Sequence, residues 1–308
     1  MAMPFRKILC PVYFDETSPI AVEYARFFAQ QDAGTVYLFH AVPTDELHLL
    51  RKVYHPREGG GGADVGWAEQ VSREKMEALA KEQLADVSYE IVTRQNSDPA
   101  KAILDEEKAI GADLAVMATH GRTGISHLIL GSVAEKVVRE SKCPVLSTRR
   151  AEALADKKPF QRLLVPVDIA EQTSAALTLA RSLVERSGGM VYPLHVVPTD
   201  ETELLLHDVY EARESPTSHK VNAVVAEKVA RQKLADLAAN QLQGQHYKPL
   251  IHVSGDPGKV ILELEKDLNA DAIIMTTHGV SGFLHLLLGS LTEKMMREAG
   301  CPVLAFRP

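Results

Sequence analysis

The chain has 308 residues, of which 45% are hydrophobic and 24% charged, and its formal net charge at pH 7 is -7. This composition is typical of an ordinary globular protein and excludes a disordered or fibrous one. The acidic balance, without any run of Lys and Arg, argues against a nucleic-acid partner, because a phosphate backbone binds to clustered basic side chains.

Cysteine number and apolar patterning narrow the class further. The sequence has three cysteines and no Cys-x-x-Cys pair, which is too few for a disulfide framework and lacks the usual spacing for zinc. No segment is apolar over the length of a membrane crossing, and the first residues lack a signal-peptide pattern. We therefore expect a cytoplasmic protein with no membrane partner.

Two long stretches of the sequence occur twice. Residues 5–25 return as 160–180, an offset of 155, and residues 117–146 return as 275–304, an offset of 158. A repeat of this length predicts two homologous domains, each able to bury its own core. We expect domain 1 at residues 1–148, a polar linker at 149–158 and domain 2 at 159–308.

In chain order, the apolar run 8–14 predicts a first strand, and Ser18 followed by Pro19 predicts the cap and first turn of a helix. The rest of the first copy predicts strands at 35–42, 89–93, 114–118 and 144–148 and helices at 99–110 and 132–141. The second copy predicts strands at 163–167, 190–197, 250–253, 272–276 and 303–306 and helices from 173 and 257. This alternation predicts an α/β fold with a parallel sheet covered on both faces in each domain.

Two kinds of residue repeat at matching places outside the loops. Asp98 and Asp256, each followed by proline, are expected to cap helices. Cys143 and Cys301 each precede a proline and an apolar strand, which favours buried, inert side chains over a redox role.

A glycine-containing loop stands at 119–132 and again at 277–290: Thr-His-Gly, nine residues, then Gly-Ser. The first glycine lets a ligand approach the backbone, and the second, at a helix start, leaves amide donors open where the helix dipole is positive. Ser132 and Ser290 can cap these helices and donate a hydroxyl to the same anion. The pattern indicates a phosphate site in each copy, and the alternative is a tight turn with an ordinary helix cap.

The loop lacks the cations that speed phosphoryl transfer. It is not a Walker loop, because no lysine precedes Ser132 or Ser290. Arg122 in the first copy is matched by Val280 in the second, so no arginine holds the same place twice. We therefore expect binding without fast hydrolysis.

Both copies resemble universal stress protein domains, and the whole chain resembles a tandem member of that family. The family signature of ATP-binding members is Gly, two residues, Gly, nine residues, Gly, then Ser or Thr. Its second and third glycines match as Gly121 and Gly131 in copy one and as Gly279 and Gly289 in copy two.

The first glycine of the signature is absent from both copies. Ala118 stands in its place in copy one and Thr276 in copy two. Threonine adds bulk beside the expected ribose, so the departure is larger in copy two.

The resemblance implies two tandem doubly wound parallel-sheet domains of the adenine nucleotide alpha hydrolase-like fold, with strand order 3-2-1-4-5. In such a sheet strands one and four separate at a switch point, where ligands bind at the carboxyl ends of the strands. The implied ligand is ATP, or AMP or ADP, with Mg2+ as an optional companion.

The resemblance also implies which residues line the two sites. In domain 1 they are Pro11, Val12, Tyr13, Ala41, His120, Gly121, Gly131, Ser132 and Val133. In domain 2 they are Pro166, Val167, Asp168, Val196, Met275, His278, Gly279, Gly289, Ser290, Leu291 and Thr292. The family has aspartate where Tyr13 stands, so Tyr13 can stack on the adenine or block it, while Asp168 keeps an acceptor and a metal contact.

Histidines recur in and near the loop. His120 and His278 either donate to phosphate oxygens or brace the loop. A metal site at His127 and His285 would need ligands that the motif does not supply, so we expect no metal there. His40 and His195 end the second strand of each copy and are expected to be hydrogen-bonded residues near the core.

These patterns favour an adenine-nucleotide-binding stress-response module that turns over slowly or not at all. Pairing of the last strands, 144–148 with 303–307, is implied within one chain, and a homodimer of such chains is compatible with it. One alternative is a slow ATPase switch that uses Asp168 with magnesium and Ser290 or His278. The other is a nucleotide-free interaction protein, which Tyr13, Ala118 and Thr276 favour.

Overall fold

The structure is a computed structural model that describes residues 4–44, 65–119, 131–148, 159–169, 174–199, 223–277 and 289–307. It divides into two compact units, Pro4–Leu154 and Ala155–Pro308. The expected linker at 149–158 lies outside the described residues. Among the residues that are described, none of the helices is both long and apolar enough to span a bilayer.

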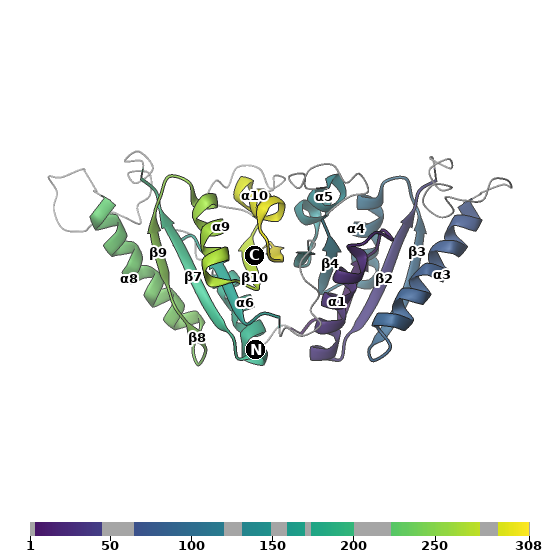
Figure 1. The fold of residues 1–308 in the computed structure, drawn as a ribbon, viewed down its shortest axis with the longest axis horizontal. Helices are drawn as coiled ribbons and strands as arrows, with labels where there is room; N and C mark the ends of the chain where they lie inside the picture. The colour runs from purple at the N-terminus through teal and green to yellow at the C-terminus, as the bar shows by residue number, and fades with distance from the viewer. Residues whose placement is uncertain are drawn as a thin grey trace. The chain divides into compact units, whose positions relative to one another are not determined.

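Domain 1 alternates strands and helices along the chain (Figure 1). Its elements are β1 (Lys7–Pro11), α1 (Ser18–Asp32), β2 (Thr35–Val42), α3 (Val65–Gln83), β3 (Ser88–Gln95), α4 (Pro99–Ile110), β4 (Leu114–Ala118), α5 (Ser132–Glu140) and β5 (Val145–Thr148). The sheet is parallel with the order β3-β2-β1-β4-β5, as predicted. Every residue of β4 is buried, as expected for a central strand covered on both faces. Helix α1 packs with α3, and α4 packs with α5.

Domain 2 repeats this arrangement (Figure 1). Its elements are β6 (Arg162–Pro166), α6 (Ser174–Ser187), β7 (Met190–Val197), α8 (Ala223–Gln241), β8 (His246–Tyr247), β9 (Leu250–Val253), α9 (Pro257–Leu268), β10 (Ala272–Thr276), α10 (Ser290–Glu298) and β11 (Val303–Phe306). The order runs β7-β6-β10-β11, and both β8 and β9 pair with β7. The extra break follows from Pro249, which stands between β8 and β9 and has no amide hydrogen for the ladder.

The first strand of domain 1 is shorter than predicted. It ends at Pro11, whereas the apolar run extends to Phe14. Phe14 has φ 58°, a left-handed conformation that no strand residue adopts. The backbone therefore turns away from the sheet directly after the buried residue Val12.

The start of α1 also differs from the sequence prediction. Ser18 is the first helical residue and Thr17 holds the cap position. The carboxylate of Asp15 accepts the backbone N–H groups of Thr17 (3.1 Å) and Ser18 (3.0 Å) and both of their hydroxyls. Asp15 thus supplies the acceptor that we assigned to Ser18.

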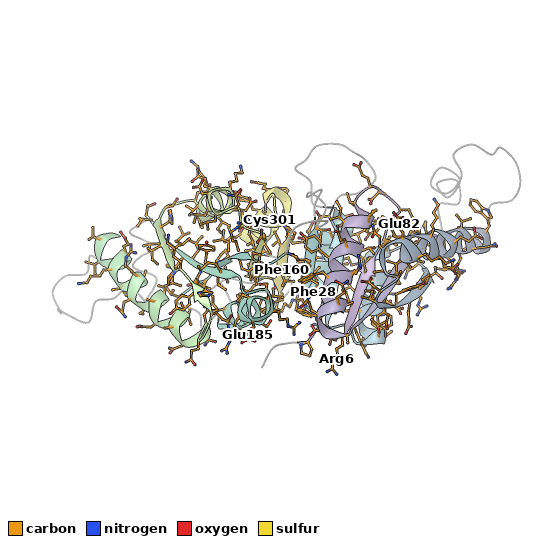
Figure 2. All side chains as sticks on the ribbon, turned by 60° about the horizontal axis from the view of Figure 1, so that its bottom comes forward. Arg6, Phe28, Glu82, Phe160, Glu185 and Cys301 are labelled. Carbon is orange, nitrogen blue, oxygen red and sulfur yellow. The ribbon has the colours of Figure 1, made fainter. Side chains whose placement is uncertain are left out.

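Large apolar side chains fill the core of each domain. Figure 2 shows Phe28 and Phe160 inside the two domains and Arg6 and Glu185 at the surface. Phe28 meets the ring of Phe5 edge to face at 5.2 Å. Such pairs add about 0.5–1.5 kcal/mol beyond the burial of their area.

All three cysteines are free and buried, as was predicted for Cys143 and Cys301. Burial, with the nearby carboxylate of Glu107 as a second cause, raises the pKa of Cys143 to about 12. Burial likewise raises the pKa values of Cys10 and Cys301. Because the thiolate is the reactive form, all three thiols are inert at neutral pH.

A buried glutamate organises the turn before the last strand of domain 1. Glu107, near the end of α4, is 5% exposed, and its Oε1 accepts the backbone N–H of Lys142 at 2.6 Å and of Cys143 at 3.3 Å. In domain 2 the matching Glu265 is 7% exposed, and its Oε1 lies within 2.9 Å of where a side chain on Gly300 would begin. The second oxygen of each carboxylate is buried without a hydrogen-bond partner in the described part of the chain.

Candidate functional site

The candidate site of each domain lies where the strand order reverses. In domain 1 strand β1 pairs with β2 on one side and with β4 on the other. The carboxyl end of β4 meets the start of α5, because the N–H of Gly131 donates to the carbonyl of Thr119, the residue after β4, at 3.3 Å. In domain 2 the N–H of Gly289 donates to the carbonyl of Thr277 at 2.9 Å. Crevices at such switch points are the usual ligand sites of open α/β sheets.

The two domains fix the end of their first strand in the same way. The N–H of Val12 donates to Phe39 O at 2.9 Å, and the N–H of Val167 donates to Leu194 O at 2.8 Å. The side chains of Val12 and Val167 are buried, so only their backbone can face a ligand. These two valines therefore set the point from which the next side chain of each domain projects.

Two buried histidines complete this anchor. His40 Nδ1 lies 2.7 Å from Val12 O, and His195 Nδ1 lies 3.0 Å from Val167 O. A carbonyl oxygen only accepts, so each Nδ1 carries the hydrogen. Both rings are less than a tenth exposed, which confirms the prediction of hydrogen-bonded residues near the core.

Helices α5 and α10 begin at this edge of the sheet with a glycine at the cap position. Gly131 and Gly289 have extended backbone angles, and neither helix has a side-chain cap hydrogen bond. The prediction that Ser132 and Ser290 cap these helices is therefore wrong. Each serine is the first helical residue and is exposed, because the glycine before it takes the cap position.

The first-turn amides of α5 and α10 are the groups of the candidate site that could accept an anion. The first four N–H groups of a helix have no acceptor within the helix, and the helix dipole makes that end positive. Glu135 and Glu293 also lie near these ends, but each forms an ion pair with an arginine one turn later, at 3.8 Å to Arg139 and 3.5 Å to Arg297. The pairing offsets part of the repulsion that these carboxylates would exert on an anion.

Thr292 distinguishes the domain 2 site. Its hydroxyl donates to Thr276 O at 3.0 Å, so it ties the first turn of α10 to the end of β10. The matching residue of domain 1 is Ala134, which has no hydroxyl. Thr292 is 2% exposed, so its side chain acts as a brace beneath the amides.

The other predicted residues fall into three groups. Pro166, Ala41, Val196, Val133 and Leu291 are half-buried at the carboxyl ends of the strands or on the first turn of the helices. Pro11 and Met275 are buried. The residues that lie outside the described part of the chain are His120, Gly121, His127, His278, Gly279 and His285.

Tyr13 and Asp168 occupy equivalent positions one residue after the buried valine. The hydroxyl of Tyr13 is buried and has no hydrogen-bond partner in the described part of the chain. Burial raises the pKa of this phenol, with a smaller effect from Asp15, so it is neutral at physiological pH. Asp168 is half-buried.

The sequence reasoning missed a repeated ion pair beside the site. Asp98 caps α4 by accepting the N–H of Lys101 at 3.0 Å, as predicted, and its other oxygen accepts Lys136 Nζ of α5 at 2.7 Å. Lys136 holds the pKa of Asp98 below its usual value. In domain 2 Lys294 of α10 lies 3.2 Å from Asp256. The recurrence of lysine at an offset of 158 was the signal available in the sequence.

Among the described residues there is no group of three or more His, Cys, Asp or Glu side chains that could hold a metal ion.

A family model describes both halves of this arrangement. The model for the universal stress protein family matches residues 4–149 and again 159–307. The chain belongs to the universal stress protein family. It is a tandem member with two domains.

Single-domain relatives align with about half of this universal stress protein. Universal stress protein MJ0577 of Methanocaldococcus jannaschii is 30% identical over 165 residues, which cover 49% of this chain and 98% of the relative. Universal stress protein YxiE of Bacillus subtilis is 37% identical over 153 residues, which cover 47% of this chain and 99% of the relative.

A solved structure matches the chain over its full length. The crystal structure of a universal stress protein from Archaeoglobus fulgidus covers 98% of this chain and 96% of its own, with a TM-score of 0.66 and 20% identity. At this identity the likeness shows the fold.

Proposed function

We propose that this universal stress protein binds an adenine nucleotide, ATP in the first place, and acts as a stress-response module rather than as an enzyme of rapid turnover. The observation that carries the proposal is the start of α10. There, amides without a side-chain cap lie beside Gly289 at the switch point of the domain 2 sheet. A helix start of this kind binds phosphate without further cations. Adenine is the base that the family resemblance implies.

Slow turnover is part of the proposal. The nearest lysine on the helix, Lys294, is held by Asp256, which leaves the first turn without a free cation among the described residues. A transferring phosphoryl group needs such a cation or metal ions to stabilise its charge. Asp168 is the residue that could hold Mg2+ against a nucleotide, through one carboxylate and the phosphates.

Isothermal titration of the full chain with ATP, and separately with AMP, tests binding. We expect saturable heat with ATP and an upward shift of the melting temperature, because a ligand that binds only the folded state stabilises it. The matched variant is Gly289→Ala. Its Cβ would lie 3.2 Å from Thr277 O, so it crowds the amide end and should weaken binding at least tenfold. No heat and no thermal shift at millimolar nucleotide would remove the proposal.

Phosphate release measures the turnover. We expect the rate of the protein with ATP and Mg2+ to equal the background and to stay there in Asp168→Ala. A rate well above background that Asp168→Ala abolishes would instead establish the slow ATPase switch.

The family resemblance also leads us to propose that β5 and β11 pair within one chain. Cysteine pairs placed on these strands should cross-link in dilute solution without forming dimers. Cross-linked dimers in place of cross-linked single chains would show that the strands pair between chains.

A further inference from the structure

The two domains differ in the residue that directly follows the anchored end of the first strand. Up to Val12 and Val167 the backbone is fixed identically, by the strand hydrogen bond and by the histidine Nδ1. The next side chain therefore starts from the same place in each domain. In domain 1 it is the phenol ring of Tyr13, and in domain 2 it is the much smaller carboxylate of Asp168.

The side chain of Tyr13 is partly buried. Its hydroxyl is buried, yet no hydrogen bond compensates the lost water in the described part of the chain. An unsatisfied buried hydroxyl costs about 1–3 kcal/mol. A side chain that merely lined an open cleft would keep its hydroxyl in water and avoid this cost, so the buried hydroxyl argues that the ring is packed rather than lining an open cleft.

The backbone after Tyr13 is held in a strained form. Phe14 has φ 58°, which costs a residue with a side chain about 1–2 kcal/mol. The centre of the Phe14 ring lies 4.5 Å from that of His40, and Phe14 packs on the apolar cluster of Val42, Ala68 and Val71. The matching Ile169 of domain 2 is not among the described residues with positive φ. Strain of this kind persists only where the surroundings over-determine it.

Hydrogen bonds hold the same segment from its other side. The N–H of Tyr13 donates to Ser18 Oγ at 3.1 Å, and Ser18 Oγ donates to Asp15 Oδ1 at 3.0 Å. Domain 2 has Ala170 in place of Asp15, which has no side-chain acceptor. Ser18 and Asp15 thus hold the backbone at Tyr13, and the side chain of Ala170 cannot reproduce the acceptor of Asp15 in domain 2.

Asp168 gives domain 2 the opposite character. It is half-buried, so water or a ligand can reach this position, and a carboxylate accepts hydrogen bonds from the hydroxyl and amine groups of a nucleoside. Thr292 also braces the amide end of α10 in this domain. Domain 2 therefore offers a carboxylate for the base or ribose of a nucleotide and helix amides for its phosphates.

We propose that the chain has one nucleotide site, in domain 2, and that Tyr13 closes the equivalent site of domain 1 by occupying the space of the base. This inference rests on the proposed function and adds the stoichiometry and the residue that sets it. Tyr13 acts as a specificity-determining residue, because it makes two domains of one fold unequal in ligand binding.

Titration calorimetry of the full chain with ATP and Mg2+ tests the inference. We expect one equivalent of ATP per chain, and we expect Asp168→Ala to weaken that binding at least tenfold. Tyr13→Asp should add a second equivalent, whereas Tyr13→Phe, which keeps the ring, should leave domain 1 closed. Two equivalents in the unchanged protein, or one equivalent that survives Asp168→Ala, would overturn the inference and leave the proposed function standing.

A second variant protects the test against misfolding. Tyr13→Asp places a charge where the phenol is buried, so Tyr13→Ala, which only opens the space, is measured beside it. Trp67 is the single tryptophan of the chain and lies in domain 1, so its emission shows whether that domain is folded. Folded Tyr13→Asp and Tyr13→Ala proteins that both still bind one equivalent would contradict the role of Tyr13. No binding by any variant, the unchanged protein included, would remove the proposed function itself.

Discussion

Replacing Glu107 with alanine is expected to destabilise domain 1 by about 2–4 kcal/mol. The substitution leaves two backbone N–H groups of a buried turn, those of Lys142 and Cys143, without their acceptor. A buried donor without a partner costs about 1–3 kcal/mol, and the 2.6 Å bond to a carboxylate belongs at the upper end of that range. The 3.3 Å bond is long and contributes less, and removal of the unpartnered Oε2 offsets a part of the loss.

Urea denaturation followed by Trp67 fluorescence measures this loss, because the only tryptophan of the chain reports on domain 1. Glu107→Gln keeps one carbonyl acceptor and should lose about half as much. The matched control is Glu265→Ala, which should leave the Trp67 transition unchanged while it lowers the stability of domain 2 in far-UV circular dichroism. The role assigned to this carboxylate would be refuted if the free energy of unfolding from the Trp67 transition of Glu107→Ala lay within about 0.5 kcal/mol of that of the unchanged protein.

Three further outcomes are expected. Asp86→Asn, which breaks the exposed pair with Arg26, should cost less than about 1 kcal/mol at pH 7 in urea denaturation. Because Arg26 lowers the folded-state pKa of Asp86 to about 2, the difference should be complete above pH 4 and disappear as the pH falls toward 2; a pH-independent difference would contradict this. Ellman's reagent should count no thiol in the native protein and three in denaturant, and rapid labelling of native Cys143 would contradict its burial. Thr292→Val should lower domain 2 stability by about 1 kcal/mol in circular dichroism and also weaken ATP binding, and unchanged affinity would reduce Thr292 to a purely structural role.

The sequence predicted the regular elements well because their signals are local. Strand β4 and the start of α4 at Pro99 follow directly from apolar runs and from Asp-Pro, and both have the predicted bounds. Errors arose where a distant group decides the local structure. The apolar letters of residues 12–14 continue the strand pattern, but packing of Phe14 on His40 turns the chain away.

The sequence predicted where the helices of the candidate site begin, but not how the Tyr13 side chain is placed beside them. Gly131 and Gly289 marked the helix starts from spacing alone. The burial of the Tyr13 hydroxyl could not be predicted, because the sequence leaves open whether the ring stacks on a bound adenine or blocks its binding. The caps were missed because a glycine cap has no side chain for the sequence to reveal.

Both ends of helix α4 are bonded to α5 or to the turn that follows it. Asp98, before its first turn, holds Lys136, and Glu107, in its last turn, holds the chain where it leaves α5 for β5. One contact in the middle of the nine-residue helix α5 and one just beyond its end restrict its motion relative to α4. A displacement of the amino end of α5 would therefore be passed to α4 through Asp98 and, through Glu107, to the turn at Lys142 and Cys143 that precedes β5.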